Sequence, residues 1–136
     1  MPWMMRKYEK SDLAGVRYLW ITSLLETSIR DQGSTSDIWA EYAPIVARLA
    51  AHSHVICDAE DRDVIWAFAS MQRDHVHMAV VKRNFEELRG ELLYALIGLK
   101  LKKPGRYTFV IPDILTEYGE MPRQWVFDPW AVGKEI

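Results

Sequence analysis

The sequence contains few of the residues that build disulfide, redox or metal sites. Its 136 residues include one cysteine, Cys57, which excludes an internal disulfide and every motif that needs two thiolates. Cys57 lies in an apolar stretch, and we expect it to be a buried structural thiol. The His75 and His77 pair lacks a third ligand, so the pattern does not favour a metal site.

Long apolar runs and an excess of one charge are also absent. No stretch of about 18 apolar residues could span a bilayer, and the first residues lack the apolar segment of a signal peptide. Acidic and basic residues are mixed along the chain, with a formal net charge of −2, which argues against nucleic acid or a membrane surface as the main partner. We therefore expect a cytoplasmic protein that binds neither.

Length and apolar content predict a single domain over residues 1–136. A chain of this length with 49% apolar residues can bury a core without metal or disulfide cross-links. It has no P-loop, dinucleotide fingerprint or G-x-S-x-G elbow, so kinase, dehydrogenase and hydrolase functions have no support.

Apolar periodicity predicts an α+β fold. Two helical patterns precede most of the strands, with N-caps expected at Ser11 and at Ser36 or Asp37, and Pro44 is expected to kink or divide the second helix. A third helix is expected over residues 86–101. Strand patterns occupy residues 3–8, 54–57, 64–71, 75–81, 106–111 and 124–127. Short polar turns predict an antiparallel meander, and the third helix predicts a parallel crossover. The expected fold is a mixed sheet of about six strands with helices on both faces.

The junction between the strand at residues 75–81 and the following helix is the candidate ligand site. A strand that runs into the first turn of a helix directs free backbone N–H groups and the positive end of the helix dipole at one place, which favours anions. Lys82 and Arg83 suit a phosphate there. Glu86 and Glu87 oppose it, because they bring carboxylates to the expected helix start.

Three stretches resemble the GCN5-related N-acetyltransferase (GNAT) superfamily. They are RKYEKSDLAGVRYLW, VICDAEDRDVIWAFASMQ and HVHMAVVKRNF, at residues 6–20, 55–72 and 75–85. The last stretch and the closing WVFDPW look most like a small branch encoded by bacteriophages and prophages. The resemblance covers about residues 5–132 and implies a GNAT-like fold, with the host cytoplasm as the location of a phage-encoded protein.

The resemblance implies a site for acetyl-CoA. In the family, the fourth strand, here about residues 77–81, splays from the fifth, here about residues 107–111, and the pantetheine arm of acetyl-CoA lies in the gap. The diphosphate binds the loop that follows. The positions that this places on the cofactor side are Val80, Val81, Lys82, Arg83 and Gly90.

The loop departs from the family pattern, Arg/Gln-x-x-Gly-x-Gly/Ala. After Phe85 the chain reads EELRGE, with one glycine in place of two. The carboxylates of Glu86, Glu87 and Glu91 would stand near the diphosphate, and each misplaced charge at a helix terminus costs up to ~1 kcal/mol. The pyrophosphate loop is therefore expected to be degenerate.

Two residues are candidates for catalysis. The resemblance implies a tyrosine acid near the leaving thiolate, and Tyr118 is the tyrosine in the matching region; the alternative is a packing or surface residue. His77 shares a strand face with His75 and is a candidate general base. The alternative is a hydrogen-bonded residue of the sheet.

Two functions from different classes follow. The first is an acyl-CoA-dependent N-acetyltransferase with an unknown acceptor amine. The second is a catalytically inactive GNAT-fold phage accessory protein that binds a host or virion protein, or a second copy of itself. Exposed tryptophans at Trp125 and Trp130 would provide the adhesive surface.

Overall fold

The fold is known from a computed structural model, which describes residues 2–26, 28–73, 75–98, 106–107 and 126–127. Its elements along the chain are β1 (Trp3–Lys7), η1 (Lys10–Asp12), α1 (Leu13–Leu24), η2 (Ser28–Gln32), α2 (Thr35–Ala50), β2 (Ser53–Asp58), β3 (Ile65–Gln72), β4 (His75–Val81), η3 (Arg83–Leu88), α3 (Arg89–Ile97), β5 (Arg106–Tyr107) and β6 (Val126–Phe127), where η denotes a 3-10 helix.

One sheet forms the centre of the molecule. Its strand order is β1-β2-β3-β4-β5-β6. The first four strands are antiparallel neighbours, whereas β4 pairs with β5 and β5 with β6 in parallel. The predicted α+β class and antiparallel meander are confirmed. Strands were also predicted at residues 106–111 and 124–127. The structure describes residues 106–107 and 126–127 of these ranges, and they form β5 and β6.

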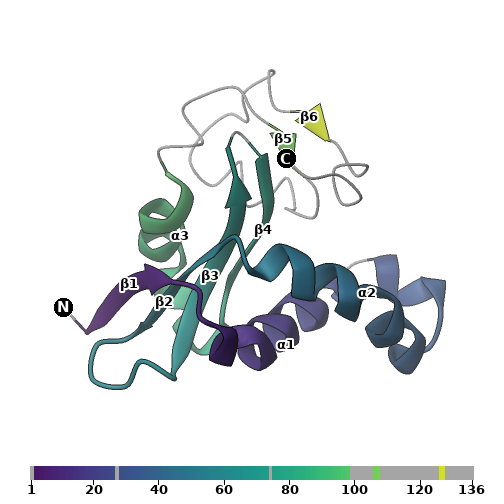
Figure 1. The fold of residues 1–136 in the computed structure, drawn as a ribbon, viewed down its shortest axis with the longest axis horizontal. Helices are drawn as coiled ribbons and strands as arrows, with labels where there is room; N and C mark the ends of the chain where they lie inside the picture. The colour runs from purple at the N-terminus through teal and green to yellow at the C-terminus, as the bar shows by residue number, and fades with distance from the viewer. Residues whose placement is uncertain (1, 27, 74, 99–105, 108–125, 128–136) are drawn as a thin grey trace.

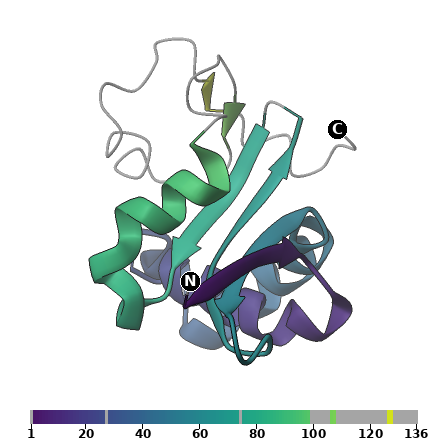
Figure 2. The same ribbon diagram turned by 90° about the vertical axis from the view of Figure 1, so that its left-hand side faces the viewer.

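The helices cover both faces of the sheet. Figures 1 and 2 show α3 on one face and the α1–α2 pair on the other. Each face has its own hydrophobic core. The core under α3 contains Ile56, Trp66, Ala67, Ala69, Val76, Ala79, Leu92, Leu93, Leu96 and Ile97. The predicted placement of helices on both faces is therefore confirmed.

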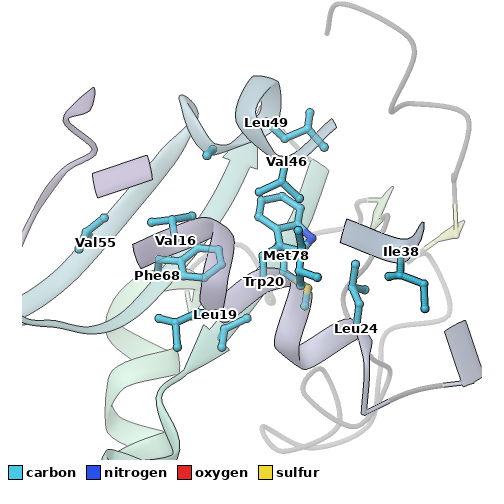
Figure 3. Packing of buried hydrophobic residues seen from close by; sticks show 13 residues of the cluster. Val16, Leu19, Trp20, Leu24, Ile38, Val46, Leu49, Val55, Phe68 and Met78 are labelled. Atoms are coloured by element: carbon cyan, nitrogen blue, oxygen red, sulfur yellow. The ribbon is translucent and has the colours of Figure 1, made fainter. Parts of the chain in front are cut away.

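The larger core lies between the sheet and the α1–α2 pair, and Figure 3 shows its side chains converging from both helices and three strands. Trp20 of α1 stacks on Phe68 of β3 with a ring-centroid distance of 5.8 Å, and both residues are fully buried. Two buried aromatic rings contribute ~0.5–1.5 kcal/mol beyond their area when they stack. This contact fixes α1 against the centre of the sheet.

The ends of the first two helices differ from the prediction. Ser11 does not cap α1; the chain enters through the 3-10 turn η1, and the Asp12 carboxylate accepts the backbone N–H of Glu9 at 2.7 Å. Ser34, two residues before the predicted Ser36, caps α2 by accepting the backbone N–H of Asp37 at 3.2 Å. Ser34 takes the capping role expected of Ser36. The N-cap residue of α1 is Asp12, which makes no side-chain cap bond to α1, because its carboxylate binds the start of η1 instead. Both predictions were therefore wrong.

Proline does not divide α2. The helix runs continuously from Thr35 to Ala50 with Pro44 inside it. Ile38 and Val46, on either side of Pro44, are buried in the same core. Packing on both sides outweighs the hydrogen bond that the proline ring removes.

Two further predictions concern burial and membranes. Cys57 is a free, buried thiol, as expected. No helix in the described ranges has both the length and the apolar composition needed to cross a bilayer.

A buried ion pair ties β1 to the start of α1. The guanidinium of Arg6 donates to both carboxylate oxygens of Asp12, at 2.7 and 2.8 Å, and the side chains are 8% and 4% exposed. Burial opposes ionisation of Asp12, but the hydrogen bonds from Arg6 and from the Glu9 backbone outweigh it, so the pKa of Asp12 lies below its ordinary value.

We expect Asp12→Asn to lower the free energy of unfolding by ~3 kcal/mol at pH 7, because it leaves the Arg6 charge buried without its partner. The contribution of Asp12 is present above the unfolded pKa of 3.8 and is lost as the pH falls through the lower folded pKa. Urea denaturation at several pH values measures this. The exposed Glu60→Gln substitution is the control, and a difference between wild type and Asp12→Asn that does not shrink as the pH falls below 3.8 would contradict the ion-pair explanation.

Candidate functional site

A hollow of about 630 Å³ lies beside β4, within the size range of small-molecule sites. Its floor is formed by four consecutive residues of β4, at positions 78–81. One wall is the face of α1 that carries Tyr18, Leu19, Thr22 and Ser23, with Glu26 just beyond the helix. The other wall belongs to η3 and the start of α3, with Lys82, Arg83, Asn84, Glu86, Arg89 and Leu93.

The floor of the hollow consists of strand backbone, because the β4 side chains are packed in the two hydrophobic cores. Met78 and Val80 belong to the core under α1, and Ala79 belongs to the core under α3. The Lys82 backbone N–H donates to the carbonyl of Trp66 at 2.8 Å. Backbone groups of an antiparallel strand alternate in direction, so those of Ala79 and Val81 point away from β3, toward the hollow.

A bulge in β4 separates this open edge from the part of the strand that pairs with β5. The register passes from Ser70↔Met78 to Met71↔Val76, which makes His77 the extra residue, and a bulge of this kind bends its strand. On the near side of the bulge, His75 and Val76 pair with β5. On the far side, residues 78–81 pair with β3 alone among the described residues. The predicted splay involves residues 108–111, which lie outside the described ranges.

The segment after β4 is a 3-10 helix rather than the start of the predicted long α-helix. The α-helix α3 begins at Arg89 instead of near residue 86. Within η3, Phe85 has the non-helical dihedral angles φ −113° and ψ 20°. Phe85 stacks on Trp66 of β3, with ring centroids 4.2 Å apart and an interplanar angle of 11°. The departure from helical geometry therefore coincides with the residue whose ring packs against the sheet.

The charges that line the hollow differ from the sequence-based expectation. Of the three glutamates expected near the phosphate, Glu86 lines the hollow, whereas Glu87 and Glu91 are exposed and lie outside its lining. Arg89 joins Lys82 and Arg83 on the positive side. With Glu26 on the negative side, three cationic and two anionic residues line the hollow, a net positive balance.

The proposed cofactor residues separate into two groups. Val80, Val81, Lys82 and Arg83 line the hollow together, whereas Gly90 does not. Among the described residues, a Cβ atom at Gly90 would meet nothing within 4 Å, so no close contact within that part of the chain requires glycine there.

The His75–His77 pair lies outside the lining of the hollow. The two rings share a strand face and stack with a centroid distance of 4.5 Å, both residues are fully buried, and His77 Nε2 lies 2.8 Å from Gln72 Oε1. Burial, followed by the charges of His75, His52 and Arg48, lowers the pKa of His77 to about 3. This placement matches the alternative of a hydrogen-bonded sheet residue, since such a pKa makes a weak general base.

Tyr118, Trp125 and Trp130 lie outside the described residues.

The α1 wall was missed by sequence reasoning. Tyr18, Thr22 and Glu26 recur at four-residue spacing, which places them on one helix face. Tyr18 is 59% exposed, and its ring centroid lies 6.5 Å from that of Trp39. The signal was this polar stripe, which lies away from the apolar stripe that the same helix buries.

Comparisons with known proteins identify a similar fold but no family. Neither the known protein families nor the curated proteins gave a match. Among solved structures, the chain is similar to the solution structure of the apo-form of YjaB from Escherichia coli, with a TM-score of 0.54 and 12% sequence identity. The match covers 75% of this chain and 66% of the YjaB chain. At this identity the similarity concerns the fold.

The low pKa of His77 predicts a loss of stability in acid. Between the ordinary pKa of 6.5 and the folded pKa of about 3, the unfolded chain binds a proton that the folded protein does not. The free energy of unfolding therefore decreases by up to ~1.4 kcal/mol for each unit by which the pH is lowered. We expect His77→Gln to reduce this slope between pH 7 and pH 4 in urea titrations. Lys10→Gln, at an exposed residue of η1, is the control; equal slopes for wild type and His77→Gln would refute the assignment.

Proposed function

We propose that the protein is a GNAT-like acyl-CoA-dependent N-acetyltransferase in which acetyl-CoA lies along the open edge of β4. The observation that carries this proposal is the hollow beside residues 78–81, with a floor of strand backbone and cationic residues at one end. Its location matches the position that the GNAT resemblance implies for the cofactor.

The floor suits the pantetheine arm. This arm is an extended chain with two amide groups, and an extended ligand can add to a sheet edge through main-chain hydrogen bonds. Ala79 and Val81 offer N–H and C=O groups on the same edge of β4, spaced about 6.8 Å apart because each strand residue rises ~3.4 Å.

The cationic end suits the phosphates. Lys82 and Arg83 follow the floor directly, and Arg89 lies beyond them. Hydrogen bonds between these side chains and phosphate oxygens are charge-assisted and therefore strong. The objection raised by three glutamates is reduced, since Glu86 alone among them lines the hollow.

The overall architecture supports the proposal at the level of the fold. The antiparallel meander and the helices on both faces are those that the GNAT resemblance implies. The complete six-stranded GNAT sheet, the phage origin and the cytoplasmic location belong to the proposal.

In the proposed reaction, the lone pair of the acceptor amine attacks the thioester carbonyl and the carbon–sulfur bond breaks. The amine loses one proton, and the departing thiolate of CoA gains one. Tyr118 remains the proposed proton donor to the thiolate. The buried and weakly basic His77 is set aside as the base, because a group with a pKa of about 3 holds almost no amine-derived proton at neutral pH.

One observation favours the second candidate, a catalytically inactive GNAT-fold accessory protein. His77, one of the two proposed catalytic residues, is buried and outside the hollow. The two candidates share a fold; the first transfers an acetyl group from acetyl-CoA, whereas the second binds a host or virion protein.

We expect isothermal titration to show binding of acetyl-CoA at micromolar strength and Lys82→Gln to weaken it about tenfold, as the loss of one charge-assisted hydrogen bond predicts. Lys10→Gln removes the same charge from an exposed residue of η1 and should leave binding unchanged. Absence of binding at millimolar CoA would exclude the transferase and leave the accessory protein.

The role of the backbone edge can be tested with proline. Val81→Pro removes an N–H group that faces the hollow and spares the bonds to β3, so we expect a folded protein with about tenfold weaker acetyl-CoA binding. Val80→Pro is the matched control, because its N–H faces β3 and its loss should lower the melting temperature. Unchanged affinity of folded Val81→Pro would contradict the proposed position of the cofactor.

An assay for the release of free CoA thiol from acetyl-CoA, with a panel of primary amines as acceptors, distinguishes the transferase from the inactive protein. Thiol release that depends on an amine supports the transferase. Tight acetyl-CoA binding without thiol release for any amine of the panel would support the inactive protein.

A further inference from the structure

An ion pair joins the two walls of the hollow. Arg83 is the first residue of η3, and Glu26 follows the C-cap of α1. The Nη2 atom of Arg83 lies 2.8 Å from Oε1 of Glu26, and both residues line the hollow. The pair therefore places a carboxylate beside a cation that the proposed function assigns to phosphate.

The exposure of this pair makes it easy to separate. The side chains of Arg83 and Glu26 are 81% and 65% exposed, and pairs of this kind contribute little to stability because water screens them and two long side chains must be ordered. Glu26 also lies at the C-terminal end of α1, where the helix dipole disfavours a negative charge. The pair is thus replaceable, in contrast to the buried Arg6–Asp12 pair.

We infer that Arg83 exchanges partners when the cofactor binds: Glu26 holds it in the free protein, and a phosphate group of CoA replaces Glu26 in the complex. This inference rests on the proposed function. Guanidinium groups bind phosphate through charge-assisted hydrogen bonds, so a multiply charged phosphate competes well with one carboxylate.

The exchange makes Glu26 a specificity-determining residue. A ligand with phosphate groups must separate the Arg83–Glu26 pair and approach the Glu26 charge, and its new contact with Arg83 compensates for this cost. Pantetheine has no phosphate group to accept a charge-assisted hydrogen bond from Arg83, so it leaves the Arg83–Glu26 pair intact. Glu26 should therefore affect the affinity for CoA and leave the affinity for pantetheine unchanged.

The experiment is a double-mutant cycle at low ionic strength, with CoA and pantetheine as the probes and isothermal titration as the readout. We expect Glu26→Gln to tighten CoA binding about threefold to fivefold and Arg83→Gln to weaken it. In the Arg83→Gln background, Glu26→Gln should have a much smaller effect, because no cation remains to be released. Glu87→Gln, an exposed residue outside the lining, is the matched control and should not change the affinity.

The outcomes separate the inference from the proposed function. If wild type binds CoA and Glu26→Gln binds it equally well, the exchange is refuted and the proposed function stands. An equal gain from Glu26→Gln with and without Arg83, or an equal gain for pantetheine, also refutes it, since Glu26 would then act without Arg83 or without the phosphate. If Glu26→Gln binds CoA and wild type does not, the natural protein makes no exchange, and both the inference and the proposed function are overturned. Absence of CoA binding by all variants overturns both.

Discussion

Burial of β4 on both faces is the constraint on which the rest of the structure depends. Met78 and Val80 pack under α1, and Ala79 packs under α3, so the side chains of this strand are committed to two cores. The main chain at its edge is what remains for recognition. In the proposed function, an extended ligand lies along this backbone, and discrimination is left to the charged residues at the end of the hollow, Lys82, Arg83 and Glu26.

Much of the fold could be predicted because its strands follow local rules. The β2–β4 meander was predicted within one residue at each end, since alternating apolar residues and short polar turns define it. The helix ends were predicted less well. The Asp12 carboxylate binds Arg6 and the Glu9 backbone in the turn before α1, where Ser11 was expected to cap the helix, and packing on both sides of Pro44 keeps α2 whole. Contacts between distant residues decide these cases, and local patterns do not contain them.

The site was predictable where sequence neighbours stay neighbours in space. Lys82 and Arg83 follow a strand directly, so their position needed no tertiary information. Thr22 and Glu26 of the α1 wall could not be assigned, because the role of an exposed helix face depends on what packs beside it. The glutamates of the loop were treated alike, yet successive residues of a helix point in different directions, and Glu86 lines the hollow while Glu87 does not.

The Trp66–Phe85 stack has a consequence for how the site can evolve. Trp66 is the extra residue of a second bulge, where the β2–β3 register passes from Ile56↔Ala67 to Cys57↔Ile65, and its ring anchors η3 from the α3 side of the sheet. The course of the main chain at the site entrance is thereby set inside the protein, whereas its ionic groups project outward. Lineages could exchange those groups and acquire new ligands while the supporting framework stays the same.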